Sequence, residues 1–475
     1  MIPFNKTKIV ATIGPASSSR ETLKALIRAG VDVCRLNLSH GNYEDHHEVI
    51  RQIRDINTEL GLHTAVLVDL QGPKLRIGEV EADSITLAAG STVTLTSVET
   101  TGTAERLYIN YPQFSEDVKA GDKILIDDGK IQLTAIASNG KDEVQARVVH
   151  GGLLSSRKGV NLPDTRISLP SITPKDRNDL QFALQQDVDW IGLSFVRSTH
   201  DLIELKKIIS LSGKRVRVIA KIEKPDALSD LDNIIHEADA LMVARGDLGV
   251  ELPMHEVPLI QKMIVNKCIK TATPVIIATQ MMESMIQNFA PTRAEVSDVA
   301  NSVLDGADAV MLSGETSVGL YPVKVVETMR NIIMTVEQKS YPYYRDLRPD
   351  MTSDTYISDS VCYQACVMAS QSNAKAIVGV TRSGYTAFKV SGQRPLAEIL
   401  IFTDNAALLP VLNLVWGVRG FFYDKSISTD DTITELQEML KEKKLVRIDD
   451  LVINLASIPL AEQGRTNMIK LGRVK

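Results

Sequence analysis

Charged and hydroxyl-bearing side chains lie near the ends of several short apolar runs in this sequence. They are Arg35, Asn37, Ser39, Asp69, Lys221, Glu223, Arg245, Asp247, Thr279, Ser313 and Glu315. Residues two apart share one face of a strand, so Lys221 and Glu223 point to the same side. Cations beside carboxylates suit a phosphate bridged by Mg²⁺, which takes one or two protein carboxylates plus substrate oxygens. Glu223 and Asp247 match that number of ligands.

Eight short apolar runs, each followed by a segment of helical character, must position these side chains. The runs cover residues 9–13, 33–37, 65–70, 190–196, 216–222, 240–245, 274–280 and 309–315. Eight strands alternating with helices predict an α/β fold, a (β/α)8 TIM barrel with its active site at the carboxyl ends of the strands. Capping boxes that start at Ser18 and Thr292 predict two helix starts, and Gly30 and Gly306 predict two helix ends.

Internal ion pairs that tie the strand ends together are the structural alternative for these charges. Each residue taken alone favours that interpretation. These charged and hydroxyl-bearing side chains nevertheless come from six strand ends, and in a barrel all six ends meet at one mouth. Their convergence favours a binding site for an anionic ligand.

Two further segments accompany the barrel. Residues 73–166 alternate short strands with glycine turns and predict a small inserted β-barrel at the mouth, where it can act as a lid. The catalytic barrel is then discontinuous, with residues 1–72 and 167–345. Residues 346–475 repeat an α/β pattern and predict a mostly parallel sheet packed between helices, with a regulatory role.

The composition excludes several classes of function. The 475 residues are 44% hydrophobic and 24% charged, as in ordinary globular proteins. A net charge of −6 gives no overall basic field for nucleic acid or an anionic membrane surface. No apolar stretch approaches the roughly 20 residues that span a bilayer. Four cysteines without close pairs suit reduced thiols, so we expect a cytoplasmic protein.

Six stretches of the sequence resemble the pyruvate kinase family. They are KIVATIGP at 8–15, RLNLSHG at 35–41, VRVIAKIEKPDAL at 216–228, MVARGDLG at 242–249, ATQM at 278–281 and LSGET at 312–316. The stretches follow the family order, and the insert and the C-terminal segment lie where the family has them. The sequence lacks the P-loop, the protein-kinase catalytic loop and a GxGxxG after a strand, so a phosphoryl-transfer enzyme here uses a different fold.

The resemblance implies the final step of glycolysis, in which phosphoenolpyruvate gives its phosphoryl group to ADP to form pyruvate and ATP. It implies that Lys221 and Arg35 bind the transferring phosphoryl group, where a cation stabilises developing negative charge. It also implies that Glu223 and Asp247 hold Mg²⁺ or Mn²⁺. A metal-dependent aldolase or lyase acting on a pyruvate-like 2-oxo acid is the alternative on the same barrel.

The carboxylate end of the substrate would lie against the segment after the sixth barrel strand. If that segment is helical, the amides near Gly246 and Asp247 form an anion seat, and Thr279 would touch the same end. Thr279, Ser313 and Glu315 are the candidates that position water or relay the proton to the enolate. The resemblance does not decide among these three.

The nucleotide site is implied by family correspondence. It comprises Pro15, Asn37, His40 and Arg76 together with Lys158 on the lid. The paired Asp127 and Asp128 at a lid turn either help to bring in a second magnesium with ADP or form a solvated hairpin turn.

A monovalent-cation pocket departs from the common family pattern. Many members bind K⁺ with residues that match Asn37, Ser39, Asp69 and the backbone of Leu70, followed by a glutamate. This sequence carries Lys74 where those members carry the glutamate. The lysine ammonium can supply one positive charge where the ion would sit, so we expect K⁺-independent activity.

The C-terminal segment is similar to the family's effector-binding region. Thr381, Ser383, Gly384 and Thr386 follow a predicted strand and offer hydroxyls and amides to the phosphate of an effector, or alternatively form only a capped turn. The loop 462–467 resembles a further part of that region. The resemblance also implies a homotetramer, with phosphoenolpyruvate, ADP or ATP, and pyruvate as its small-molecule partners.

Overall fold

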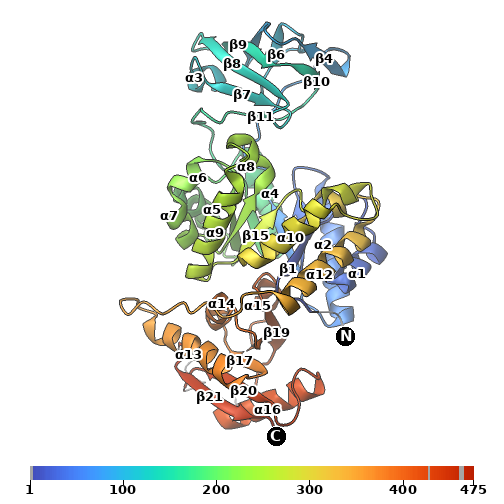
Figure 1. Ribbon diagram of the computed structural model, residues 1–475. Helices are drawn as coiled ribbons and strands as arrows, with labels where there is room; N and C mark the ends of the chain where they lie inside the picture. The colour runs from blue at the N-terminus through green and yellow to red at the C-terminus, as the bar shows by residue number, and fades with distance from the viewer. Residues whose placement is uncertain (1–3, 426–427, 459–464) are drawn as a thin grey trace.

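The computed structural model describes residues 4–425, 428–458 and 465–475, and Figure 1 shows three parts stacked along one direction. The middle part is a closed barrel of eight strands in the order β1-β16-β15-β14-β13-β12-β3-β2, with parallel neighbours. The strands are β1 Lys8–Thr12, β2 Val33–Asn37, β3 Ala65–Asp69, β12 Trp190–Leu193, β13 Arg217–Ile222, β14 Ala240–Ala244, β15 Val275–Ala278 and β16 Ala309–Leu312. These are the eight predicted runs, so the TIM barrel is confirmed.

Six barrel strands end earlier than their apolar runs suggested, by one residue in β1, β3 and β14 and by two or three residues in β12, β15 and β16. β14 ends at Ala244, β15 at Ala278 and β16 at Leu312. Thr279 has a φ of 69°, in the left-handed region that no strand residue adopts, so the chain leaves the barrel there. Thr279 and Ser313 therefore begin the loops at the mouth and are not the last residues of strands.

Eight helices cover the outside of the barrel, one after each strand (Figure 1). They are α1 Arg20–Ala29, α2 Tyr43–Leu60, α4 Pro174–Gln185, α5 Thr199–Leu211, α7 Leu231–Glu237, α9 Val257–Thr271, α10 Arg293–Asp305 and α12 Pro322–Lys339. The prediction of Ser18 as a cap is wrong by one residue, because Ser19 is the extended residue whose hydroxyl accepts the helix amide. Thr292 forms the predicted capping box, and Gly30 and Gly306 end α1 and α10 at φ values of 118° and 102°.

The insert lies over one end of the barrel (Figure 1). Its strands are β4 Ser84–Leu87, β5 Thr92–Thr96, β6 Arg106–Tyr108, β7 Lys123–Ile126, β8 Ile131–Ser138, β9 Glu143–His150, β10 Gly152–Ser155 and β11 Val160–Asn161, with α3 Phe114–Asp117 and the 3-10 turn η1 Glu81–Asp83. Six of them form a sheet in the order β11-β7-β8-β9-β5-β6, and β10 pairs with β4. Both sheets share one hydrophobic core that includes Leu87, Leu133 and Leu154.

The C-terminal part lies at the opposite end of the barrel (Figure 1). Its sheet has the order β19-β18-β17-β20-β21, and only β21 is antiparallel. The elements are α13 Tyr356–Ser372, β17 Ala376–Val380, α14 Tyr385–Gly392, β18 Glu398–Thr403, α15 Leu408–Leu412, β19 Val418–Phe422, α16 Thr429–Glu442, β20 Leu451–Ala456 and β21 Met468–Arg473. Sequence reasoning missed β21, an edge strand in which no residue is buried.

A buried ion pair joins the barrel to the C-terminal part. Arg394 donates from Nη2 to Asp308 Oδ2 and to the carbonyl of Gly306, each at 2.9 Å. The backbone N–H of Trp416 donates to Asp308 Oδ1 at 3.3 Å. This junction holds the start of β16 against the C-terminal sheet. Within the described ranges, no helix is both long and apolar enough to cross a membrane.

Candidate active site

Charges from three barrel strands meet on one carboxylate at the mouth. Arg35 on β2 donates from Nε to Asp69 Oδ2 at 3.0 Å, and Lys221 Nζ on β13 lies 3.0 Å from the same oxygen. Arg35 also donates from Nη1 to Thr12 Oγ1 at 3.0 Å. The internal ion pairs considered as the structural alternative therefore exist. The interpretation as a binding site depends on the polar groups at the mouth that these pairs leave unused.

The ion pairs fix the charge state of this cluster. Burial alone would raise the pKa of Asp69, but Lys221 and Arg35 outweigh it and hold the pKa below its usual value. Burial alone would lower the pKa of Lys221, but Asp69 and Glu223 raise it. Lys221 is thus a buried cation at neutral pH, and a buried cation acts strongly on a phosphoryl group because water does not screen it.

Glu223 and Asp247 form the candidate metal site. Glu223 Oε1 lies 3.0 Å from Lys221 Nζ, and Oε2 accepts a hydrogen bond from the backbone N–H of Phe195 at 2.8 Å. Burial raises the pKa of Glu223; Lys221 opposes this shift, and the charges of Asp247 and Asp69 add to it. Asp247 lies in the short helix α8 Arg245–Glu251, without a hydrogen bond or ion pair to any described residue. Two carboxylates that repel each other, one of them unpaired, fit a divalent cation.

Substrate oxygens are needed to complete this metal site. Among the described residues, no group of three or more His, Cys, Asp or Glu side chains is placed to hold a metal ion. A pair of carboxylates is nevertheless the usual protein contribution to Mg²⁺, which keeps water and phosphate oxygens as its other ligands.

A glycine makes room for the central carboxylate. A Cβ on Gly192 of β12 would lie 2.6 Å from Asp69 Oδ1. Gly192 and Asp69 are paired in the register of β12 and β3, so the contact is built into the barrel. Asp69 Oδ1 is buried and has no hydrogen-bond partner among the described residues.

Replacing Gly192 with Ala is expected to displace Asp69 and to lower kcat by about tenfold. Overpacking at this contact is also expected to reduce the free energy of unfolding by about 1–3 kcal/mol. Steady-state kinetics and denaturant unfolding measure the two effects. Gly152→Ala is the matched control, because its nearest atom is 3.8 Å from the new Cβ. Equal kcat values for the two variants would contradict the positioning role of Gly192.

A strained residue follows β15 at the mouth. Thr279 adopts a φ of 69°. Its Oγ1 accepts a hydrogen bond from the backbone N–H of Gly246 at 2.7 Å and donates to the carbonyl of Ala278 at 2.6 Å. Arg245 donates from Nη2 to the Thr279 carbonyl at 2.8 Å and pairs with Asp298 at 2.7 Å. Arg245 therefore holds the loop that presents Thr279.

Ser313 and Glu315 differ in what they touch. Glu315 is buried, and its carboxylate accepts from the backbone N–H groups of Ser313 at 2.7 Å and Met282 at 3.1 Å. These bonds bind two mouth loops together. Ser313 Oγ is buried and has no partner among the described residues. Burying a hydroxyl without a hydrogen-bond partner costs free energy, unless a water molecule or the substrate forms that hydrogen bond.

Sequence reasoning missed Ser194. Its Oγ accepts a hydrogen bond from Lys221 Nζ at 2.7 Å and donates to the carbonyl of Leu70 at 2.7 Å. Ser194 therefore orients the lysine ammonium. Its position supplied a signal, because it directly follows β12, a barrel strand to which no site residue had been assigned.

The nucleotide candidates divide between the barrel and the insert. Pro15 follows β1, Asn37 is the last residue of β2, and His40 follows β2. The pKa of His40 is lowered, first by burial and then by the charges of nearby cations, among them Arg76 and Lys74. On the insert, Lys158 Nζ lies 2.9 Å from Asp127 Oδ1, and Arg76 donates to the carbonyl of Arg157 at 3.0 Å. Asp127 and Asp128 have φ values of 51° and 55° and form the predicted hairpin turn.

A direct hydrogen bond joins the insert to the barrel mouth, and the sequence did not indicate it. Asn161 on β11 donates from Nδ2 to Glu251 Oε1 at 2.8 Å. The same oxygen lies 2.5 Å from Lys224 Nζ. Lys224 directly follows the metal candidate Glu223, so this bond connects the insert to the segment that carries the candidate site.

The residues of the monovalent-cation pocket lie together at the ends of β2 and β3. Asn37 Oδ1 accepts from the backbone N–H of Ser39 at 3.1 Å, and the Leu70 carbonyl accepts from Ser194. Lys74 is half-buried. Its Cε lies 4.0 Å from the position that a Cβ would take on Gly159, so its side chain lies beside another segment of the insert.

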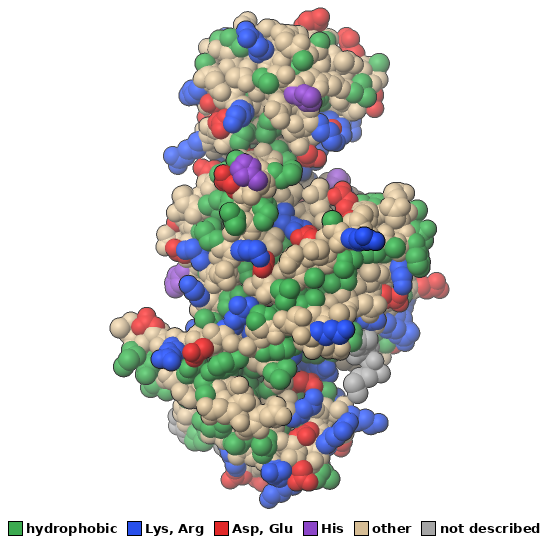
Figure 2. Space-filling view, in the orientation of Figure 1, with side chains coloured by type: hydrophobic (Ala, Val, Ile, Leu, Met, Phe, Trp, Pro, Cys, Tyr) green, Lys and Arg blue, Asp and Glu red, His purple; other side chains and the backbone are tan. Residues whose placement is uncertain are grey.

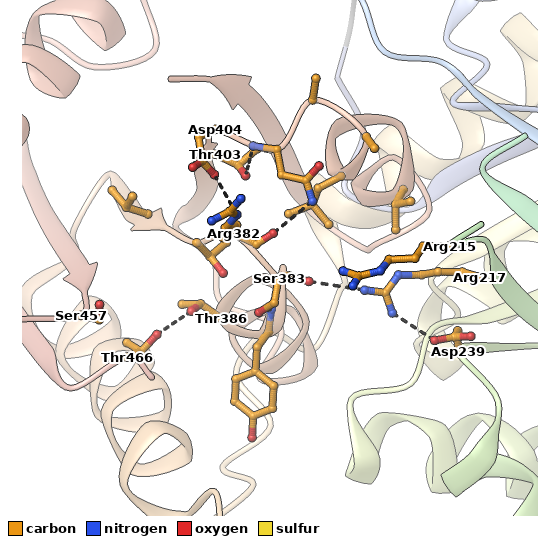
Figure 3. Close-up of a pocket in the computed structure, with 18 of the residues that line it drawn as sticks. Arg215, Arg217, Asp239, Arg382, Ser383, Thr386, Thr403, Asp404, Ser457 and Thr466 are labelled. Carbon is orange, nitrogen blue, oxygen red and sulfur yellow. Dashed lines mark hydrogen bonds and ion pairs between the residues drawn. The ribbon is translucent and has the colours of Figure 1, made fainter. Parts of the chain in front are cut away.

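The effector candidates border a cavity of about 1570 Å³ between the barrel and the C-terminal part (Figure 3). Thr381, Ser383 and Thr386 line it, whereas Gly384 caps α14 at a φ of 86° and does not. Thr386 Oγ1 and Thr466 Oγ1 lie 2.7 Å apart. Of the loop 462–467, residues 462–464 lie outside the described ranges, and Arg465 and Thr466 line the cavity.

Two family models match the chain. The model described as "Pyruvate kinase, barrel domain" matches residues 4–326, and the one described as "Pyruvate kinase, alpha/beta domain" matches residues 359–471. Both matches coincide with parts of the fold described above.

Whole-chain similarities agree with these matches. A pyruvate kinase from Geobacillus stearothermophilus is 43% identical over 470 residues, which cover 98% of this chain and 80% of that protein. A pyruvate kinase from Mycobacterium tuberculosis is 42% identical over 468 residues, which cover 98% of each chain. A crystal structure of a pyruvate kinase from Cryptosporidium parvum superposes with a TM-score of 0.93 at 33% identity, covering 99% of this chain and 96% of the other.

Proposed function

The chain belongs to the pyruvate kinase family, and from this premise we propose how its barrel mouth moves the phosphoryl group of phosphoenolpyruvate to ADP, giving pyruvate and ATP. The observation that carries the proposal is the position of Lys221 Nζ, buried and 3.0 Å from both Asp69 Oδ2 and Glu223 Oε1. The lyase alternative has no support, because the relatives described above are all named pyruvate kinases.

A coupled assay of pyruvate formation tests the activity. With phosphoenolpyruvate, ADP and Mg²⁺, turnover of about 1–100 per second is expected. Omission of ADP is the control that separates phosphoryl transfer from hydrolysis. Absence of ADP-dependent turnover would contradict the proposal.

Two cations bind the transferring phosphoryl group in this proposal. Lys221 and Arg35 both point their nitrogens at Asp69, so their positions are set before substrate arrives. Such preorganised positive charge stabilises the equatorial oxygens in the transition state without rearrangement. Gly246, Asp247 and Thr279 receive the carboxylate end of the substrate.

Glu223 and Asp247 hold Mg²⁺, or Mn²⁺, in this proposal. Their proximity is supported by the effect of Asp247 on the pKa of Glu223. A divalent cation bound there neutralises negative charge on the carboxylate and phosphate oxygens of the substrate. Lys221 beside the same carboxylate keeps the net charge of the site low when the cation is absent.

Ser313 and Thr279 are the proposed hydroxyls near the enolate. Ser313 Oγ is buried without a partner, which supports a water or substrate contact there. Thr279 already shares its hydroxyl with Gly246 and Ala278. Glu315 accepts two backbone N–H groups, which supports a role in positioning Ser313. A hydroxyl is a weak acid, so a relay through water supplies the proton.

We propose that Pro15, Asn37, His40, Arg76 and Lys158 bind the nucleotide. Lys158 pairs with Asp127 in the chain alone, and this pair would open when a phosphate arrives. The lowered pKa of His40 leaves its ring neutral at pH 7, so it contributes a hydrogen bond and not a charge.

We also propose that activity does not require K⁺. Lys74 supplies a positive charge at this side of the mouth, since it is among the charges that lower the pKa of His40. Asn37, Ser39, Asp69 and Leu70 then serve as the polar surroundings of the site without the ion. The rate of the native chain at fixed ionic strength is expected to be independent of K⁺.

Replacing Lys74 with Glu is expected to create a requirement for K⁺. The carboxylate removes a positive charge and adds a ligand, so K⁺ should raise kcat by at least about tenfold at fixed ionic strength. Lys74→Gln separates loss of the charge from gain of the ligand. Strong K⁺ activation of the native chain, or none in Lys74→Glu, would contradict the role of Lys74.

A homotetramer and a cytoplasmic location are further proposals. Large apolar side chains, including Met254, Leu259, Phe289 and Leu320, are exposed on the α9 to α12 side of the barrel. Figure 2 shows such side chains gathered over the region of α10. Exposed apolar patches of this kind mark association surfaces. All four cysteines are free thiols, which suits a reducing compartment.

We propose the division into residues 1–72 with 167–345, 73–166 and 346–475. A core confined to the insert supports the middle boundary.

We further propose that Thr381, Ser383, Gly384 and Thr386 bind the phosphate of an effector. The cavity beside this loop and its hydroxyl groups support that role.

A further inference from the structure

The insert contacts the barrel mouth at the C-terminal end of α8. Asn161 on β11 donates from Nδ2 to Glu251 Oε1 at 2.8 Å, and Figure 1 shows β11 directly above α8. Beside this bond, a Cβ on Gly129, in the turn between β7 and β8, would lie 4.0 Å from Val250 Cγ1. Two segments of the insert therefore lie against two consecutive residues of α8.

The backbone of the insert fixes the position of Asn161. Asn161 pairs with Leu125 in the antiparallel register of β11 and β7. The adjoining turn is held as well, because the backbone N–H of Asp127 donates to the carbonyl of Gly159 at 3.0 Å. The side-chain amide of Asn161 therefore moves together with the sheet of the insert.

Glu251 is a buried carboxylate whose two partners bind the same oxygen. Its side chain is 1% exposed; Oε1 accepts from Asn161 and lies 2.5 Å from Lys224 Nζ, and Oε2 has no partner among the described residues. A negative charge at the C-terminal end of a helix is unfavourable, and so is a buried carboxylate oxygen without a hydrogen bond. Lys224 supplies the opposite charge. Of the two partners, Asn161 is the one that belongs to the insert.

The helix α8 connects Glu251 to the candidate metal site. Asp247 and Glu251 lie four residues apart in α8, so their side chains project from the same face of the helix. One turn of helix, about 5.4 Å in length, separates them. A displacement of Glu251 is therefore transmitted to Asp247, because the short helix between them moves as one piece.

We propose that Asn161 couples the docked position of the insert to the affinity of the metal site formed by Glu223 and Asp247, with Glu251 and α8 as the connection. The inference rests on the proposed metal site and adds Asn161 as a positioning residue, which acts on the cation only through Glu251. The docked insert holds Glu251, and Glu251 keeps α8 and Asp247 in place. The coupling changes the concentration of cation that fills the site, so saturating cation overcomes it.

The coupling must also act in the opposite direction. If the docked insert favours a bound cation, then a bound cation favours the docked insert by the same factor. Both directions can be measured on the full-length chain without phosphoenolpyruvate or ADP, so neither measurement depends on turnover.

Mn²⁺ binding, followed by electron paramagnetic resonance, tests the first direction. Asn161→Ala is expected to raise the Kd for Mn²⁺ about fivefold, at the lower end of common coupling factors. Asn161→Leu, which keeps a side chain of similar size but cannot donate, should raise the Kd equally. Gln145→Ala is the matched control, because Gln145 is an exposed amide on β9 of the insert without a hydrogen bond to any described residue. It should keep the native Kd.

Hydrogen exchange tests the second direction. In the native chain, saturating Mg²⁺ should slow amide exchange about fivefold in residues 125–130 and 158–161, the part of the insert that lies against α8. In Asn161→Ala, Mg²⁺ should leave exchange in these residues unchanged. Exchange in residues 143–150 of β9 serves as the internal reference.

The outcomes separate the coupling from the metal site. If Asn161→Ala, Asn161→Leu and the native chain bind Mn²⁺ with equal Kd, or if Gln145→Ala raises the Kd as much as they do, the coupling is wrong and the metal site stands. Slowing of exchange by Mg²⁺ that persists in Asn161→Ala would also refute the coupling. If the native chain does not bind Mn²⁺, or Asp247→Asn binds it as tightly as the native chain, the metal site and the coupling are both wrong.

Discussion

Replacing Lys221 with Met is expected to lower kcat by about 10³-fold while leaving the KM for ADP nearly unchanged. The variant removes the buried cation that faces the transferring phosphoryl group. It also leaves Glu223 without its charge partner, although Asp69 keeps Arg35. The coupled assay of pyruvate formation measures the change in kcat, and thermal unfolding measures the accompanying loss of stability.

Lys224→Met is the matched control for this prediction. Lys224 is also buried on the same segment, and its partner Glu251 lies 2.5 Å away. Removing either lysine leaves a buried carboxylate, which is strongly destabilising. When kcat is calculated per folded molecule, only Lys221→Met should show a large loss. Lys221→Arg, which keeps the charge, should recover part of the activity. A kcat for Lys221→Met within twofold of native would refute the role given to this lysine.

Replacing Asp247 with Asn is expected to weaken metal binding by at least about tenfold and to lower kcat by about 10²-fold at saturating Mg²⁺. Asp247 is the one candidate ligand with no partner among the described residues, so its carboxylate is free for a cation. The amide keeps the shape of the side chain but removes the charge. The measurements are Mg²⁺ dependence of the rate and Mn²⁺ binding by electron paramagnetic resonance, which does not depend on turnover.

Glu256→Gln provides the control for Asp247→Asn. Glu256 is an exposed carboxylate at the start of α9, just beyond α8, and its side chain forms no cap. Glu256→Gln changes the net charge by the same amount as Asp247→Asn, at a nearby position. Equal Mn²⁺ affinity in Asp247→Asn and in the native chain would show that the carboxylate is not a ligand.

The charge cluster at the barrel mouth was predictable from the sequence because strand periodicity acts locally. Lys221 near the end of β13 and Glu223 directly after it lie two residues apart, so an extended chain points them to the same side whatever surrounds them. Arg35 lies two residues before the end of β2, and Asp69 is the last residue of β3, which is adjacent to β2 in the barrel. The barrel itself was predictable because its eight parallel strands are buried and therefore read as continuous apolar runs.

Other contacts join residues that are far apart in the sequence, so no local sequence pattern could indicate them. Ser194 reaches both Lys221 and the carbonyl of Leu70 only because β12 lies between β3 and β13 in the closed barrel. Likewise, Gly192 must be small because the register places it opposite Asp69. The edge strand β21 escaped detection because an edge needs no continuous apolar run.

The sequence by itself determined the number and order of the barrel strands, the family, and the charged side chains that lie at the barrel mouth. These features follow from apolar periodicity and from short motifs, which are properties of neighbouring residues. Only the tertiary structure decided which groups stay unpaired. Asp247 and Ser313 are polar residues like many others in the sequence, and their lack of partners within the described chain appears only when every neighbour is in place. Pairing is a property of the whole packed molecule, because each buried polar group either finds a partner or is available to a ligand.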